Sequence, residues 1–200
     1  MRYRTLHLLT LILLIGWPPI VSAQSGDVAS NGHRRWHVSR QCLGLTYHPG
    51  GATTPEAYPL KVDHRAFLVL DVGAAANLDC SVGDHAFLRF TTTLYKDCAS
   101  VTAGCLHAGP RLGYSWGRNS LNVGIGPILS LREDWHRFPE YQDDEFYGDR
   151  VYRGWQYRLF GSAAEVEYLR RVGGDTELQC SLIPGVSLVV TLMVALRWAL

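Results

Sequence analysis

The chain has 200 residues, of which 47% are hydrophobic and 18% charged, and its formal net charge is +1. This composition excludes disordered, collagen-like and coiled-coil chains. The small net charge gives no broad electrostatic case for nucleic acid, so we expect no nucleic-acid partner. The 20 glycines and 9 prolines leave little room for long uninterrupted helices.

Residues 1–23 have the pattern of a secretory signal peptide. Two early arginines supply a positive start, a short apolar run follows, and small residues precede a cleavage site after Ala23. The apolar run is too short for a membrane-spanning helix. We therefore expect an exported protein, with an N-terminal segment at 24–35 and a folded domain at 36–200.

Export exposes the five cysteines of the chain to an oxidising compartment. Cys98 and Cys105 flank a short segment of small residues and are the pair that we expect to form a disulfide. Cys42, Cys80 and Cys180 are expected to be small apolar wall residues. No cysteine spacing fits a zinc site, and we predict neither a metal nor a cofactor.

Alternation of apolar with small or polar residues runs through most of the domain. In 119–133 the odd positions are apolar and the even ones are mostly small or polar, as on a strand with two different faces. The same alternation marks the segments 84–96, 104–116, 152–171 and 176–183, and more weakly 36–47 and 65–76. None of them has a helical period, which predicts an all-β domain.

The alternation in 152–171 changes phase by one residue near Gly161. A β-bulge would cause this shift without ending the strand. A tight turn at Gly161 and Ser162 would cause it by adding a strand. The pattern is compatible with both interpretations.

The connections between the predicted strands alternate in length. Short turns rich in Gly, Asp and Asn alternate with longer polar loops; the turns are 77–84, 117–119 and 173–175, and the loops are 48–63, 97–103 and 134–151. Short turns at one end and longer loops at the other are typical of antiparallel barrels in the bacterial outer membrane.

Aromatic residues fall at both ends of the predicted strands, as expected of two membrane-interface belts. The loop end has Tyr95, Trp135 and Trp155, and the turn end has Trp116, Tyr168 and Trp198.

The terminal segment 188–200 alternates apolar residues and places Trp198 close to the end of the chain. With the signal peptide, it resembles small bacterial outer-membrane β-barrel proteins, the general pattern of OmpA-type and lipid A-modifying barrels. The resemblance implies a single up-and-down antiparallel barrel of about eight strands, embedded in outer-membrane lipid. It also implies insertion by the barrel-assembly machinery through the C-terminal strand, although Leu200 replaces the family's usual terminal aromatic.

A C-terminal anchor helix at 186–200 is the alternative interpretation of this segment. It is shorter than the roughly 20 residues that a spanning helix needs. A barrel also requires a closing strand at this point.

Charged residues lie on the polar faces of the predicted strands. A charge facing hydrocarbon is costly, so these side chains are expected to point into the lumen of a membrane barrel, where acids and arginines nearly balance. The predicted lumen network is Asp71, Arg89, Arg111, Arg132, Arg158, Glu165, Glu167, Glu177 and Arg197.

One motif suggests catalysis. Residues 113–117 match the G-x-S-x-G pattern of α/β-hydrolases, which needs a strand-to-helix turn at Ser115, but another strand is predicted to follow. An enzymatic alternative uses His107 or His85 near Ser115. Barrel lipid A deacylases carry a His-x-Ser-Asn stretch that this sequence lacks, so no catalytic residue is transferred from them.

We expect a non-enzymatic outer-membrane barrel with a structural, adhesive or partner-binding role through its external loops. The acidic, aromatic-rich loop 134–151 is the candidate for an external partner. One alternative is a membrane-embedded acyl hydrolase or lipid A-modifying enzyme. The other is a soluble secreted lipocalin-like barrel with an apolar lumen that binds a small apolar ligand, since alternation alone does not say which face points inward.

Overall fold

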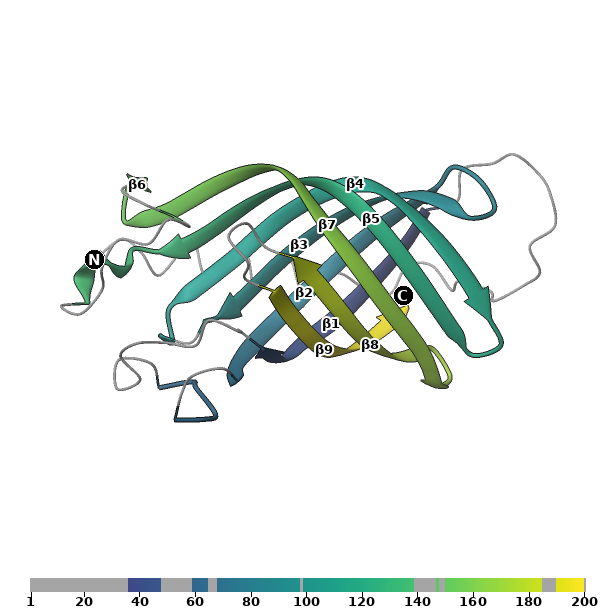
Figure 1. Ribbon diagram of the computed structural model, residues 1–200, viewed down its shortest axis with the longest axis horizontal. Helices are drawn as coiled ribbons and strands as arrows, with labels where there is room; N and C mark the ends of the chain where they lie inside the picture. The colour runs from purple at the N-terminus through teal and green to yellow at the C-terminus, as the bar shows by residue number, and fades with distance from the viewer. Residues whose placement is uncertain are drawn as a thin grey trace. The chain divides into compact units, whose positions relative to one another are not determined.

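The alternating segments form the strands of one antiparallel sheet (Figure 1). In chain order the strands are β1 (Trp36–Tyr47), β2 (Leu68–Ser81), β3 (Ala86–Lys96), β4 (Thr102–Trp116), β5 (Asn119–Glu133), β6 (Val151–Tyr152), β7 (Trp155–Gly173), β8 (Thr176–Pro184) and β9 (Val190–Ala199). A short 3-10 helix, η2 (Trp135–Arg137), follows β5.

This computed structural model describes residues 36–47, 59–64, 68–97, 99–138, 147, 150–184 and 190–199. The predicted signal peptide and the segment 24–35 lie outside the described residues. So does most of the acidic part of the loop 134–151.

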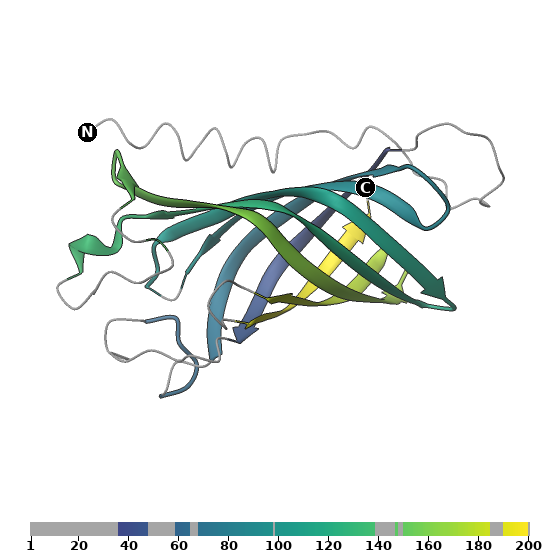
Figure 2. The same ribbon diagram turned by 45° about the horizontal axis from the view of Figure 1, so that its top comes forward.

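Eight of the nine strands form the wall of a closed barrel. Each wall strand pairs with its neighbours along the chain, β5 pairs with β7, and β9 pairs back with β1. The two-residue β6 lies beside the start of β7 within the β5–β7 connection. Figure 2 shows the wall strands inclined around a common axis. The predicted all-β, up-and-down barrel is confirmed.

The phase change in β7 is a β-bulge. The pairing of β5 with β7 shifts between Gly126 and Ile128, so that two residues of β7, Gly161 and Ser162, lie opposite the single Pro127. Proline has no N–H to donate to a ladder, and a bulge is where a strand tolerates it. The bulge turns the odd positions of β7 inward after Gly161, where the even positions point inward before it.

The terminal segment is a strand. β9 pairs with β8 on one side and with β1 on the other, so it closes the barrel. The anchor-helix alternative is therefore wrong. In the part of the chain that the structure describes, no helix has the length and apolar character to cross a membrane.

Two predicted connections are shorter than expected. β2 continues to Ser81 rather than ending at residue 76, because its last residues pair with both β1 and β3. β4 already begins at Thr102, so the predicted loop 97–103 is a tight connection. Asp97 shapes it, since its Oδ1 accepts the backbone N–H groups of Ala99 and Val101 at 3.0 and 3.1 Å.

The predicted disulfide between Cys98 and Cys105 is wrong for Cys105, whose thiol is free. The register of β3 and β4 places Cys105 opposite Thr93, and the Thr93 hydroxyl donates to its Sγ at 3.3 Å. Cys98 lies outside the described residues. Cys80 and Cys180 are also free thiols.

We expect Gly126→Ala to destabilise the barrel, because β4 and β5 approach closely at this position. A Cβ on Gly126 would overlap the backbone carbonyl of Ala108. Relieving this overlap would require the backbone of β4 or β5 to move. The expected loss is about 1–3 kcal/mol in the free energy of unfolding, measured by urea titration of tryptophan fluorescence. Gly161→Ala is the matched control, because a Cβ there meets open space. Equal effects of the two variants would contradict the prediction.

Candidate functional site

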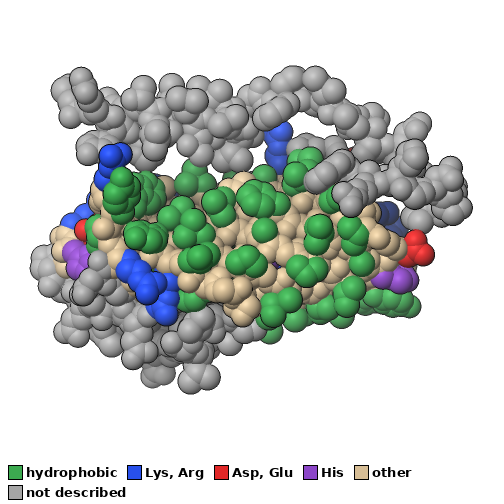
Figure 3. Space-filling model, turned by 90° about the horizontal axis from the view of Figure 1, so that it is seen from above, with side chains coloured by type: hydrophobic (Ala, Val, Ile, Leu, Met, Phe, Trp, Pro, Cys, Tyr) green, Lys and Arg blue, Asp and Glu red, His purple; other side chains and the backbone are tan. Residues whose placement is uncertain are grey.

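The outer surface of the barrel is apolar on every wall strand. Figure 3 shows hydrophobic side chains distributed over one face of the molecule. The large exposed apolar side chains of the wall strands include Val38, Leu70, Val72, Leu78, Leu88, Phe90, Leu106, Leu112, Leu121, Val123, Ile125, Leu159, Val166, Leu178, Leu182, Val194 and Leu196. Water-soluble barrels place such residues inside, so this surface has the polarity of a barrel surrounded by lipid.

The lumen contains charged and polar side chains. The buried polar residues on the wall strands include Ser39, Asn77, Asp79, Arg89, His107, Arg111, Asn122, Arg132, Gln156, Glu167, Gln179, Ser181 and Arg197. A lipocalin-like protein requires the opposite arrangement, with an apolar lumen for its ligand. The lipocalin-like alternative is therefore wrong.

Arg89 is the centre of a charge network that crosses the lumen. Its Nε and Nη2 donate to the two carboxylate oxygens of Asp79 at 2.7 and 3.0 Å. Its Nη1 donates to both oxygens of Glu167 at 2.9 and 3.0 Å. Arg89 is 3% exposed and Glu167 is 2% exposed, so water does not screen these bonds.

Arg197 of β9 extends the network to β1 and β8. Its Nε donates to Ser39 Oγ at 3.0 Å. Its guanidinium nitrogens lie 3.4 Å from Asp79, 3.5 Å from Glu167 and 3.9 Å from Glu177. We refer to Asp79, Arg89, Glu167, Glu177 and Arg197 as the central network.

The network also reaches β5, where Asn122 Nδ2 donates to Glu167 Oε1 at 2.7 Å. Together with Asn122 and Ser39, its members come from every wall strand except β4. Paired hydrogen bonds between guanidinium and carboxylate groups neutralise the buried charges and also hold the side chains in a defined orientation.

A second ion pair, between the buried Arg111 of β4 and the half-buried Glu165 of β7, also lies in the lumen. Arg111 Nη2 donates to Glu165 and lies 2.9 Å from His107 Nδ1. Arginine only donates, so Nδ1 of His107 accepts, and the proton of the neutral ring is placed on Nε2. His107 is thus held as a hydrogen-bond partner of Arg111.

A different set of residues closes the loop end of the barrel. The guanidinium of Arg132 lies between two rings, 4.0 Å from the centroid of Trp135 and 4.1 Å from that of Tyr147. Its Nε donates to Gln156 Oε1 at 2.8 Å. Cation–π contacts of a desolvated arginine are among the stronger ones. We refer to Asp97, Arg132, Trp135, Tyr147 and Gln156 as the loop-end cap.

Asp97 anchors the cap to the β3–β4 connection. Its Oδ2 accepts the indole N–H of Trp135 at 3.0 Å, and Trp135 packs with Ala99 and Val101 in a small buried cluster. Trp135 is only 7% exposed, so its predicted place in a lipid-facing belt is wrong. Its ring turns inward because Arg132 and Asp97 both bind it there.

Burial raises the pKa of Asp97 above its ordinary value, because desolvation disfavours the carboxylate. The bonds from the Val101 N–H, the Trp135 indole and the Ala99 N–H oppose this shift without cancelling it. The pKa of Asp134 is shifted in the opposite direction. Slight burial acts to raise it, but the hydrogen bonds from the backbone N–H and the ring of His136 outweigh this and lower the pKa.

The predicted lumen residues fall into separate groups. Arg89, Glu167, Glu177 and Arg197 meet in the central network, Arg111 pairs with Glu165, and Arg132 belongs to the cap. Arg158 is half-buried, with its guanidinium 4.8 Å from the ring of Phe160. The side chain of Asp71 lies outside the described atoms.

Asp79 is the member of the central network that the sequence interpretation does not include. The predicted turn at 77–84 contains it, whereas β2 continues past it. The alternation of Asn77 and Asp79 with Leu78 and Cys80 is the signal that would have extended the strand.

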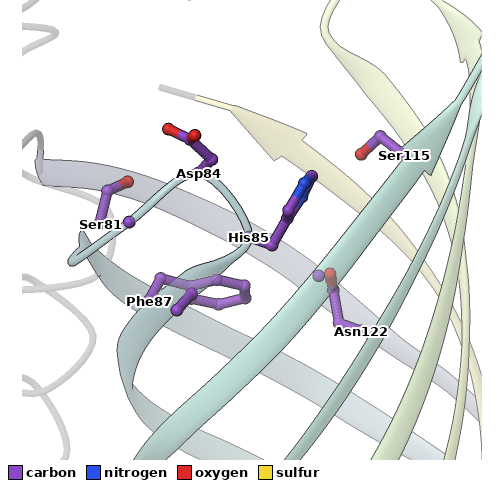
Figure 4. Close-up of a pocket in the computed structure, with 9 residues that line it drawn as sticks. Ser81, Asp84, His85, Phe87, Ser115 and Asn122 are labelled. Atoms are coloured by element: carbon purple, nitrogen blue, oxygen red, sulfur yellow. The ribbon is translucent and has the colours of Figure 1, made fainter. Parts of the chain in front are cut away.

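The structure brings together two of the three residues of the enzymatic alternative. Ser115 and His85 both line a shallow hollow of about 170 Å³ at the turn end (Figure 4), and Ser115 Oγ lies 2.9 Å from Ser120 Oγ. His107 is on the same strand as Ser115 but roughly 25 Å away at the usual rise per residue. Gly117, at φ 56°, leads directly into β5 rather than into a helix.

Among the described residues, no group of three or more histidine, cysteine or acidic side chains has a geometry that could hold a metal ion.

The fold and the lumen together define an inside-out β-barrel, the class whose strands span a membrane. No protein-family model matches the chain, and no curated protein is detectably similar in sequence. Among solved structures, Neisserial surface protein A matches at 10% identity over 82% of this chain and 96% of its own, with a TM-score of 0.46.

Two further structures show a similar degree of likeness. Ail, the attachment invasion locus protein of Yersinia pestis, matches at 10% identity over 82% of this chain and 97% of its own, with a TM-score of 0.42. The outer membrane protein AlkL matches at 12% identity over 90% and 97%, with a TM-score of 0.40.

We expect Arg89→Met to cost about 3–5 kcal/mol in the free energy of unfolding, because it leaves buried carboxylates without their main partner. Adding Glu167→Gln should recover part of this loss, since it removes one uncompensated charge. The measurement is urea titration in detergent micelles.

The control for Arg89 is the exposed pair of Arg137 and Glu133, which lie 3.3 Å apart. Arg137→Met should change stability by less than about 1 kcal/mol. If Arg89→Met had as small an effect, the central network would not be what stabilises the barrel.

We also expect Asp97 to make stability depend on pH. Its pKa is raised in the folded protein, so the folded state holds this proton more tightly than the unfolded state, whose aspartate pKa is about 3.9. The ionised carboxylate therefore disfavours folding above the folded pKa and has no effect below the unfolded pKa. Stability relative to Asp97→Asn should fall as the pH rises through this interval, in urea midpoints of both proteins. A difference that is constant with pH would refute it.

Proposed function

We propose that this protein is a bacterial outer-membrane barrel with a closed lumen, which presents its loop end at the cell surface for a structural, adhesive or partner-binding role. The observation that carries the proposal is the central network, which crosses the lumen and joins strands on opposite sides of the barrel. A transport pathway would have to pass through these contacts.

The burial of the network supports a closed lumen. Arg89, Glu167 and Arg197 are 3%, 2% and 5% exposed. Opening a path along the axis would break these charge-assisted hydrogen bonds, which are among the stronger ones in proteins. Eight-stranded barrels have interiors just wide enough for side chains to fill.

The loop end supports a surface role. The connections at 48–67 and 134–154 are long, whereas 117–118 and 174–175 at the other end are two-residue turns. The buried Trp135 and Tyr147 of the cap attach the longer loop to the barrel through Arg132. A partner at the loop 134–151 is part of the proposal.

The terminal strand supports insertion by the barrel-assembly machinery. β9 points Val194 and Leu196 outward at 40% and 43% exposure and Arg197 inward at 5%. It thus has one lipid-facing side and one side that completes the central network.

The test combines membrane fractionation, gel mobility and solute release. We expect the protein in the outer-membrane fraction, with a band that shifts between unboiled and boiled samples. Liposomes that contain it should retain a small fluorescent dye as well as protein-free liposomes do, while a general porin in parallel releases the dye. A soluble protein without a band shift would refute the membrane assignment, and dye release would refute the closed lumen.

A further inference from the structure

An arginine faces outward near the turn end of the barrel. After the bulge, the even positions of β7 point away from the lumen, so Val166, Tyr168 and Arg170 share the outer face. Arg170 is exposed, and the described residues form no ion pair with it. An unpaired guanidinium on the outer face of a membrane barrel needs a partner of opposite charge at the membrane interface.

Aromatic rings mark the depth of this position. Tyr114, Trp116 and Tyr168 form a continuous strip, with ring centroids 5.9 Å apart between the first two and 6.4 Å apart between the last two. The Tyr168 hydroxyl donates to Asn119 Oδ1 at 2.7 Å, which fixes the ring against β5. Such rings lie at the level of lipid headgroups. The order valine, tyrosine, arginine along β7 therefore runs from hydrocarbon to headgroup.

A second arginine lies beside Arg170. Arg118 occupies the β4–β5 turn, and its carbonyl accepts the backbone N–H of Arg171 at 2.8 Å. The next residue, Asn119, is the register partner of Arg170. Arg118 is also exposed and has no ion pair with a described residue. The two hairpins thus present neighbouring cations beside the aromatic strip.

The acidic residues on the neighbouring hairpin leave this charge uncompensated. Glu177 points into the lumen, where its nearest cation is Arg197 at 3.9 Å. Asp175 is exposed in the β7–β8 turn and forms no ion pair with a described residue. The local charge favours an anion, and guanidinium groups match the oxygens of a phosphate with paired hydrogen bonds.

We propose that Arg118 and Arg170 bind the phosphate of a membrane phospholipid in the leaflet at the turn end, with Trp116 and Tyr168 against its glycerol and upper acyl region. This inference rests on the proposed membrane location. A lipid rather than a free anion is the occupant because Arg170 shares the outer face with Val166 and Leu178, both 38% exposed apolar residues.

The test uses the full exported chain, purified and folded in detergent, with phosphatidylglycerol as the probe. Native mass spectrometry counts the lipid molecules retained by the wild type and by the double variant Arg118→Gln with Arg170→Gln. We expect the variant to lose affinity by roughly fivefold per arginine. The control is Arg150→Gln with Arg153→Gln, which removes the same charge from exposed positions at the loop end and should keep wild-type retention.

The outcomes separate this inference from the proposed function. Equal retention by the two double variants, with the heat-dependent band shift intact, would overturn the lipid site and leave the membrane barrel standing. Stabilisation of lipid-free protein by inorganic phosphate as large as that by phosphatidylglycerol would also overturn it, because the site would then bind a free anion. Absence of the band shift and of membrane association would overturn the proposed function itself.

Discussion

The pairing of Arg89 with Asp79 and Glu167 is the interaction on which the rest of the structure depends. A guanidinium group keeps its charge in proteins, so a buried arginine must meet anions wherever the chain places it. Glu167 is 78 residues away in sequence, and it meets Arg89 only when the barrel is closed. The central network is thus satisfied by closure and disrupted by any other arrangement of the strands.

The polarity of the whole barrel follows from placing the charges inside. Each strand has one polar and one apolar side, and directing the polar side to the lumen leaves the apolar side on the outer surface. This surface is stable in lipid and not in water. It confines contact with soluble molecules to the two ends of the barrel. The two ends differ in the chemistry of their residues and in the length of their connections.

The two ends are built by different means. At the loop end, Arg132 is held between Trp135 and Tyr147, and Asp97 ties the same tryptophan to the β3–β4 connection. The polar groups of the cap bind one another. At the turn end, Arg118 and Arg170 have no ionic partner among the described residues, and their surroundings are aromatic. The loop-end cap fixes the connections around it, whereas the outward-facing Arg118 and Arg170 are free to bind an anion, as proposed above.

The sequence by itself determined where the strands lie and which side chains share a face, because the two-residue period is a local property of extended backbone. It also located the phase change at Gly161 and most of the lumen charges. Only the tertiary structure decided which face is inside, that Gly161 and Ser162 form a bulge, and that Asp79 belongs to the network. It also turned Trp135 inward and left Cys105 a free thiol. These features depend on contacts between residues that are remote in sequence, and the closure of the barrel is what brings those residues together.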